Sequence, residues 1–161
     1  MTGITIRAAS EHDTRLLLRL IYDFADYEGR PDICVVTEPA LLSALFGPRP
    51  LMHAILAEDA GAIVGYALVF AYFAPYPGVT SLFMEHLYVV EGRRGQGIGR
   101  ALLRRVAQIA VEQGADRLEW GVLKANAPAI RFYDRLGATR VDDFTACRLE
   151  GDALRRVAGT G

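Results

Sequence analysis

Hydrophobic and polar residues follow first a strand-like and then a helix-like spacing at the start of the chain. A short β-branched run at residues 4–7 predicts a strand. Ser10, followed three residues later by Asp13, is typical of a helix start, and apolar residues then recur at helical spacing over residues 17–24. Residues 38–46 show a second, shorter helical pattern. The pattern therefore predicts a strand followed by two helices.

The middle of the chain contains a long uncharged run, residues 60–84. A run of this length is sufficient to span a bilayer as a helix. Two prolines and a glycine interrupt it within residues 75–78, and its content of Val, Ile, Tyr and Phe favours strands. We therefore expect two strands, residues 63–73 and 80–90, the first in a hairpin with residues 52–57. A membrane-spanning segment is the less favoured alternative.

Strand and helix patterns alternate in the second half of the chain. Apolar residues at spacings of three and four over residues 98–110 predict a helix, and residues 118–123 predict a strand. Asn126 is expected to cap a further helix, which is followed by two last strands within residues 139–149 and a helical tail at 152–157. This order predicts an α+β fold with a mixed, mostly antiparallel central sheet flanked by helices.

Composition indicates one domain over residues 1–161, because 52% hydrophobic residues supply a sizeable core. The formal net charge of -1 gives no bulk attraction to nucleic acid or to anionic membranes, so neither is an expected partner. Cys34 and Cys147 form neither a CxxC motif nor a Cys/His cluster, which indicates no disulfide framework and no metal site. The N-terminal residues lack a secretion signal, so we expect a cytoplasmic protein.

The stretch EGRRGQGIGRALL, residues 91–103, places four glycines directly before a helical pattern. Unpaired backbone N–H groups at a helix start bind phosphate, and glycines let the backbone approach it closely. A Walker A loop requires GxxxxGK[ST]. Gly92 and Gly97 have that separation, but Ile98 and Gly99 follow instead of Lys and Ser or Thr. A nucleoside-triphosphate loop is therefore excluded.

A dinucleotide loop is a second alternative for this stretch. It requires GxGxxG or GxGxxA, and after Gly95 and Gly97 the last position is Arg100, which is too bulky for close packing of helix on strand. Glu119, about twenty residues further on, matches the acidic residue that binds ribose in that motif. A single strand, helix and strand unit behind an antiparallel meander does not make a doubly wound fold, so this alternative is less favoured.

A third pattern, [Q/R]-x-x-G-x-[G/A], matches RGQGIG at residues 94–99 and resembles the coenzyme A pyrophosphate loop of the GNAT family of N-acetyltransferases. The strand MEHLYVV precedes the loop, and FYDRLGA ends the next predicted helix, as in that family. The resemblance covers nearly the whole chain. It implies acetyl-CoA as cosubstrate without a metal, and it implies cofactor contacts from Arg94, Gly95, Gln96, Gly97, Ile98, Gly99 and Arg100.

The stretches ADYE, FMEHLYV, NAPAIRFY and LEGDALRRVAG are similar to the spermidine/spermine and thialysine acetyltransferase branch of the family. That similarity implies a homodimer that acetylates a small-molecule amine, either a polyamine or a thialysine-like amino acid. The chain departs from the branch at His86, where an acid is usual, at Ala125, where tryptophan is usual, and in a shorter stretch at 137–149. Peptide or aminoglycoside amines and a non-catalytic acyl-CoA-binding module are the alternatives.

The resemblance also assigns roles to two titratable residues. An alkylammonium with a pKa near ~10 must lose its proton before it can attack at pH 7, at a cost of about 4 kcal/mol. Glu85 is the expected general base, and it is the first charge after 25 uncharged residues, 60–84. Tyr133 is the expected general acid toward the coenzyme A thiolate. The competing interpretations are a solvated strand glutamate and a core tyrosine.

Further residues are expected to hold the two substrates. The resemblance implies that the strand backbone at Leu87 and Val89 pairs with the pantetheine arm, and that Asn126 contacts the cofactor as well as capping its helix. Tyr27 and Glu28, at the end of the first helix, and His86, next to Glu85, are expected to bind the amine. His86 in place of an acid favours a substrate that bears its own carboxylate. A solvated helix end is the competing interpretation for the Tyr27 region.

Overall fold

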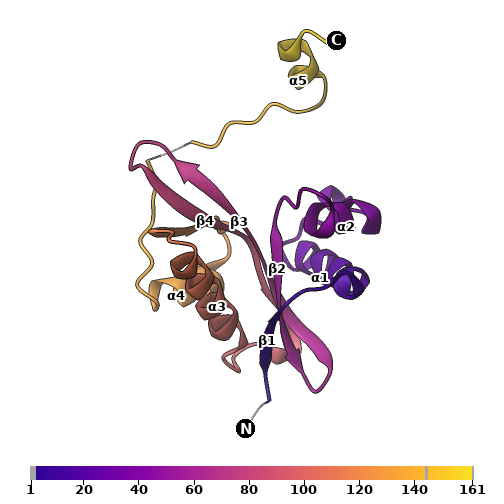
Figure 1. The fold of residues 1–161 in the computed structure, drawn as a ribbon, viewed down its shortest axis with the longest axis vertical. Helices are drawn as coiled ribbons and strands as arrows, with labels where there is room; N and C mark the ends of the chain where they lie inside the picture. Colours follow the sequence, from indigo (N-terminus) through magenta and orange to yellow (C-terminus); the bar gives the residue numbers. More distant parts are fainter. Residues whose placement is uncertain (1–2, 144, 161) are drawn as a thin grey trace. The chain divides into compact units, whose positions relative to one another are not determined.

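Five strands form one sheet in the order β1-β2-β3-β4-β5 (Figure 1). The structure is a computed structural model that describes residues 3–143 and 145–160, and the chain divides into two units, residues 1–121 and 122–161. All five strands lie in the first unit: β1 (Thr5–Ala8), β2 (His53–Asp59), β3 (Ala62–Ala74), β4 (Val79–Val89) and β5 (Arg117–Trp120). Neighbours from β1 to β4 are antiparallel and β5 joins β4 in parallel, which confirms the predicted α+β fold.

Helices cover both faces of this sheet within the first unit (Figure 1). Helices α1 (Thr14–Tyr27) and α2 (Glu38–Phe46) lie on one face, and α3 (Ile98–Glu112) lies on the other. A buried cluster joins α1 and α2 to β2, β3 and β4, and its members are Leu17, Leu20, Ile21, Leu41, Leu45, Ala54, Leu56, Tyr66, Leu68 and Tyr88. On the other face α3 buries Ile98, Leu102 and Val106. The apolar faces predicted for α1 and α3 are the ones that the fold buries.

The uncharged run of residues 60–84 forms strand β3, the β3–β4 turn and the first half of β4. Most of β3 is buried between the two helix layers, which explains why the run carries no charge. Gly78, with a φ of 68°, occupies the turn where the two prolines and the glycine were expected to break the run. Within the described residues, no helix has the length and hydrophobicity that a membrane span requires.

The second unit contains helices α4 (Ala127–Asp134) and α5 (Gly151–Ala158). The prediction of two strands within residues 139–149 is wrong for the described part, residues 139–143 and 145–149, because this part contains no strand. Val141 and Leu149 are more than half exposed there, and an isolated extended segment without a pairing edge gains no sheet stability. The predicted strand at 118–123 is also too long, since β5 ends at Trp120, just before Gly121.

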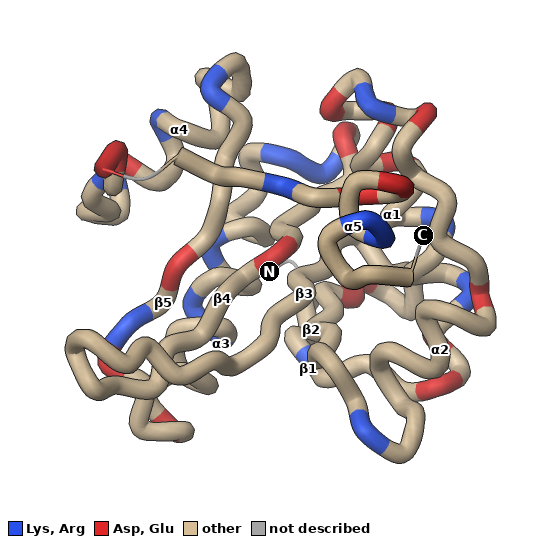
Figure 2. Tube along the Cα trace, turned by 90° about the horizontal axis from the view of Figure 1, so that it is seen from above, with Lys and Arg blue, Asp and Glu red and all other residues tan. Residues whose placement is uncertain are grey.

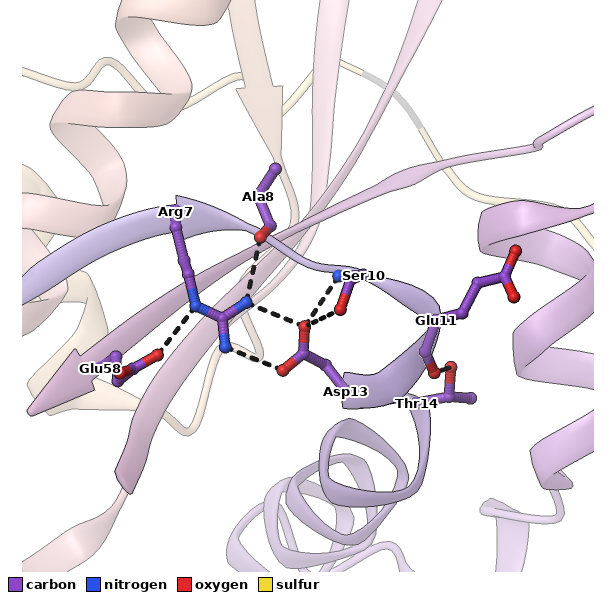
Figure 3. A network of polar contacts seen from close by, with 7 residues as sticks. All are labelled: Arg7, Ala8, Ser10, Glu11, Asp13, Thr14 and Glu58. Carbon is purple, nitrogen blue, oxygen red and sulfur yellow. Dashed lines mark hydrogen bonds and ion pairs between the residues drawn. The ribbon is translucent and has the colours of Figure 1, made fainter. Parts of the chain in front are cut away.

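Arg7 connects three parts of the first unit (Figure 3). Its Nη1 and Nη2 donate to the two carboxylate oxygens of Asp13 at 2.8 Å, and its Nε donates to Oε2 of Glu58 at 2.8 Å. The backbone N–H and the hydroxyl of Ser10 donate to Asp13 as well, as predicted for a capped helix start. The Arg7 guanidinium holds the pKa of the Asp13 carboxyl well below its usual range. This network fixes β1 to the entrance of α1 and to the end of β2.

Replacing Arg7 with glutamine is expected to lower the free energy of unfolding by about 1–2 kcal/mol at pH 7, a value discounted for the partial exposure of the pair. Because pairing lowers the pKa of Asp13, the ion pair contributes fully to the free energy of unfolding when the pH is above the ordinary aspartate pKa of about 3.9. This contribution is lost as the pH falls below that pKa. Urea denaturation at pH 7 and pH 2 measures both effects, and the deficit of Arg7→Gln should shrink at pH 2.

The matched control is Arg15→Gln, because the Arg15–Glu38 pair is mostly exposed and its shortest contact is longer, at 3.4 Å. Its free energy of unfolding should stay within about 0.5 kcal/mol of the parent. An equal loss for both variants would show that the Arg7 network adds nothing specific.

Candidate active site

The glycine-rich stretch forms the connection between β4 and α3. A short 3-10 turn, η3 (Glu91–Arg93), begins it, and Gly95 and Gly97 follow with φ angles of 76° and 83°. Residues that bear a Cβ rarely adopt this left-handed backbone conformation, which explains the need for glycine at both positions. A Cβ built on either glycine meets no atom within 4 Å, so the backbone lies next to open space. The loop therefore leaves room for a group that approaches the main chain closely.

Gly97 is also the N-cap of α3, and none of the described side chains caps this helix. The N–H groups of the first helical turn have no partner within the helix and carry partial positive charge. Arg100 extends this turn with an exposed cation. Uncapped donors beside two open glycines are the features that phosphate-binding helix N-termini share.

Arg94, the first residue of the motif, is held by two elements. Its Nε donates to the carbonyl oxygen of Val89 at 2.9 Å, and its guanidinium carbon lies 4.0 Å from the ring centroid of Tyr27 and 5.6 Å from that of Tyr88. Stacking of a guanidinium on an aromatic ring is favourable. Tyr27, predicted to bind the amine, is thus brought together with the glycine loop through Arg94.

Arg93 stabilises the loop from its other side. Its guanidinium pairs with the carboxylate of Asp59 at the end of β2, and its Nε donates to Oε1 of Gln96 at 3.2 Å. The side-chain amide of Gln96 is therefore turned toward Arg93 within the loop. Arg93 and Asp59 were not singled out from the sequence, because their contact depends on where the β2–β3 hairpin ends.

Strands β4 and β5 pair only as far as Met84 and Trp120, so the following part of β4 lies free on that side among the described residues. Val90 donates its N–H to the carbonyl of Val64 on β3 at 3.0 Å. Successive residues of a strand direct their backbone groups to opposite sides, so Leu87 and Val89 direct theirs away from β3. The Val89 carbonyl accepts from Arg94, and the other backbone groups of these two residues are left for pairing in the part of the chain that the structure describes.

Glu85 is the extra residue of a β-bulge in β4. Its neighbours Met84 and His86 pair with Val69 and Leu68, which are consecutive on β3, so no residue of β3 is left opposite Glu85. The bulge changes the phase of the strand: Tyr88 joins the core cluster with α1 and α2, whereas Met84 is buried outside that cluster. Glu85 itself is exposed, at the point where β4 leaves β5. The bulge thus directs this carboxylate out of the regular strand pattern.

His86 packs against the end of α1. Its Nδ1 lies 2.9 Å from the hydroxyl of Tyr66, and its ring meets that of Phe24 edge to face at 4.9 Å. Burial lowers the pKa of His86 to about 4, so the imidazole is neutral at pH 7. His86 therefore lies beside Glu85 as a partly buried, uncharged ring. Tyr66, which completes this pair, was missed from the sequence, where it is one of several aromatic residues of an apolar strand.

Glu28 ends α1 as its C-cap residue. It is half-buried, and burial raises the pKa of its carboxyl, with Arg30 acting in the opposite direction. A desolvated carboxylate gains more from a cation than an exposed one does. The prediction that Glu28 contacts an ammonium group has this physical support, and the contact itself stays a prediction.

Tyr133 and Asn126 belong to the second unit, in and next to α4. Asn126 caps that helix, because its Oδ1 accepts from the N–H of Ala129 at 3.2 Å, which confirms the predicted cap. Burial raises the pKa of Tyr133 to about 12, so its hydroxyl keeps its proton at neutral pH. A phenol in this state still carries the proton that a general acid must supply. The cofactor contact of Asn126 and the acid role of Tyr133 stay predictions.

Glu119 has protein partners in the first unit. The hydroxyl of Tyr72 donates to its carboxylate, and Arg117 lies 3.7 Å from it. The sheet order also differs from that of a doubly wound fold. Both findings disfavour the dinucleotide alternative. Acidic and basic residues are spread over both units (Figure 2), and no group of three His, Cys, Asp or Glu side chains in the described chain is suited to hold a metal ion.

Comparison with known proteins identifies the family of the chain. Residues 17–138 match the sequence model of the acetyltransferase (GNAT) family. The thialysine N-epsilon-acetyltransferase of Bos taurus is 35% identical over 170 aligned residues, which cover 99% of each chain. The L-ornithine N5-acetyltransferase of Arabidopsis thaliana is 26% identical and covers 94% of this chain and 86% of its own. An integron cassette protein from V. cholerae superposes with a TM-score of 0.82 at 25% identity, over 98% of this chain and 99% of that protein.

Proposed function

Since the chain belongs to the acetyltransferase (GNAT) family, in the branch of the diamine and thialysine acetyltransferases, and is an N-acetyltransferase, we propose that it transfers the acetyl group of acetyl-CoA to the primary amine of a small molecule. The position of Glu85 carries this proposal. Glu85 is the bulged residue of β4 at the point where that strand parts from β5, a few residues before an anion-binding loop. The proposed base and the proposed phosphate site are thus joined by the end of one strand.

Three features of the first unit suit coenzyme A. Gly95 and Gly97 leave open space beside the uncapped N-terminus of α3, where the pyrophosphate is proposed to bind. The open backbone groups of Leu87 and Val89 offer a strand edge to the amide groups of pantetheine. Arg94 spans the two features, because it contacts both Val89 and the loop's neighbour Tyr27. The donor is therefore proposed to lie along β4 with its acetyl end toward Glu85.

Glu85 is proposed to remove the proton that the ammonium group must lose. Its carboxylate accepts this proton directly or through one water molecule, and the free amine then attacks the acetyl carbon. The C–N bond forms as the C–S bond breaks, and the sulfur leaves with the bonding electron pair. Tyr133 is proposed to give its proton to that sulfur, which its raised pKa allows because the hydroxyl is protonated throughout the neutral range.

The substrate is proposed to be a diamine or a diamino acid. The relatives are named as acetyltransferases of thialysine and of L-ornithine, both of which carry two amino groups. Glu28, half-buried at the end of α1, is proposed to bind the distal ammonium, and Tyr27 is proposed to line the same region. The resemblance also implies a homodimer, which light scattering would test.

Thiol release from acetyl-CoA across a panel of amines tests this substrate class. The panel contains thialysine, L-ornithine, spermidine, an aminoglycoside and a lysine-bearing peptide. We expect kcat/KM to be highest for one of the three small amines, and we expect Glu28→Gln to lower that value. The proposed class is wrong if the peptide or the aminoglycoside is the best substrate, and the assignment of Glu28 is wrong if its variant changes no value.

Replacing Tyr133 with phenylalanine is expected to lower kcat by roughly 10- to 100-fold or more while acetyl-CoA affinity is kept, because only the hydroxyl is removed. Steady-state kinetics and calorimetry measure the two quantities. Phe132→Leu serves as the neighbouring control, since it alters aromatic packing in α4 without touching a hydroxyl. If Tyr133→Phe and the parent turn over equally between pH 6 and 9, with chemistry rate-limiting, another group is the general acid.

A further inference from the structure

The contact between Tyr66 and His86 determines which nitrogen of the imidazole carries the proton. Tyr66 is fully buried on β3, with 0% of its surface exposed, and its hydroxyl meets only Nδ1 of His86 among the described residues, at 2.9 Å. A buried hydroxyl that donates no hydrogen bond is costly. Tyr66 therefore donates to Nδ1, which must be unprotonated to accept. The neutral ring then carries its proton on Nε2.

The Nε2–H group of His86 is an available donor. It has no hydrogen-bond partner within residues 3–143 and 145–160. It is also not sealed from solvent, because in this part of the chain the only buried side-chain nitrogen or oxygen without a partner is Oγ of Ser81. Phe24 packs edge to face with the ring and limits its rotation. A fixed donor that retains some access to solvent thus lies on the residue next to Glu85.

A neutral His86 suits an anionic group of the substrate better than a second cationic group. Burial keeps the ring neutral at pH 7, so it offers one N–H and no negative charge. An aspartate or glutamate at this position would attract a second ammonium and repel a carboxylate. The negative charges of Glu28 and Asp23 contribute to raising the pKa of the Tyr66 hydroxyl, whereas His86 itself offers a donor without a negative charge.

We propose that Tyr66 holds His86 as the Nε2–H tautomer and that His86 binds the carboxylate of an amino-acid substrate. The proposal rests on the proposed function, because it places the substrate next to Glu85. It assigns His86 a part in substrate selection and Tyr66 the part of a positioning residue. The favoured substrate class is then a diamino acid, in which one amine is acetylated and the carboxylate is bound by His86.

Nitrogen NMR of the protein with ¹⁵N-labelled histidine tests the tautomer directly. The chain has three histidines, of which His12 and His53 are exposed, and the spectrum of His86→Leu identifies the third. We expect a neutral His86 with a protonated Nε2, and we expect Tyr66→Phe to shift the ring toward a mixture of tautomers. A protonated Nδ1 in the parent would overturn the proposal.

The same spectra test the ligand. Thialysine should shift the His86 Nε2 resonance, and the diamine that lacks its carboxylate should leave it in place. In kinetics the ratio of kcat/KM for these two amines should fall about tenfold in His86→Leu and in Tyr66→Phe, the loss of one hydrogen bond to a charged group. The ratio should stay unchanged in His53→Leu, and the double variant should lose no more than His86→Leu.

These readouts separate the proposal from the proposed function. Absence of acetyl transfer to every amine would refute the function, while the NMR titration would still report whether His86 binds a carboxylate. Equal ratios in the parent, His86→Leu and Tyr66→Phe, or an Nε2 resonance that both amines shift alike, would overturn the role of His86 even in an active acetyltransferase.

Discussion

Glu85→Gln is expected to lower kcat/KM for the best small amine by about 10²- to 10⁴-fold at pH 7, the usual contribution of a general base. Glutamine keeps the shape of the side chain and cannot accept the proton. The ratio of parental kcat/KM to that of Glu85→Gln should decrease as the pH rises toward ~10, because the amine then loses its proton without assistance. Initial rates between pH 6.5 and 10 measure the effect, and acetyl-CoA affinity should not change.

Glu11→Gln is the matched control, because Glu11 is an exposed glutamate at the start of the 3-10 turn η1 (Glu11–Asp13). Its kinetics should equal those of the parent. A Glu85→Gln variant with parental rates at pH 7, or with a loss that stays constant up to pH 10, would show that another group accepts the proton.

Gly97→Ala is expected to weaken acetyl-CoA binding by roughly 10- to 150-fold, which corresponds to the loss of one hydrogen bond to a charged oxygen. A Cβ at this position enters the open space beside the first turn of α3, where the pyrophosphate is proposed to lie. Calorimetric titration with acetyl-CoA measures the dissociation constant.

Alanine at a positive φ also strains the backbone by about 1–2 kcal/mol, so the loss of stability must be separated from the loss of binding. Gly114→Ala provides the matched control: Gly114 follows the other end of α3, has a φ of 69° and also faces open space. Both variants should lose similar thermal stability, and only Gly97→Ala should lose affinity. If a folded Gly97→Ala variant binds acetyl-CoA with the affinity of the parent, the pyrophosphate does not bind at this loop.

Local sequence signals account for the parts of the fold that were predicted well. Helix α2 has the predicted bounds, Glu38–Phe46, because Thr37 caps its start and Gly47 ends it. The long uncharged run resolved into β3 and β4 because its turn residues are local signals as well. Each of these signals acts within a few residues of the boundary that it sets.

Tertiary pairing accounts for the features that the sequence did not reveal. The bulge at Glu85 exists because β3 offers two consecutive partners, Leu68 and Val69, to β4 residues that flank the glutamate. The Tyr66–His86 contact depends on the same register. Glu85 and His86 could thus be named from the sequence, whereas the bulge at Glu85 and the tautomer of His86 could not.

The strands expected within residues 139–149 were predicted from local sequence but are not formed by the described residues. Their β-branched and aromatic residues match strand propensity, yet the described residues there are exposed and form no strand. Strand propensity reflects packing on a sheet, so without a pairing edge it does not determine structure. The prediction relied on local composition where a partner was required.

Direct detection of acetyl transfer tests the central claim. The protein is incubated with acetyl-CoA and thialysine, and mass spectrometry follows the amine while free thiol is counted in parallel. The account predicts one acetylated amine for each coenzyme A released, at a rate that falls in Glu85→Gln and is kept in Glu11→Gln. Thiol release without an acetylated amine, or equal transfer by Glu85→Gln and the parent, would contradict it.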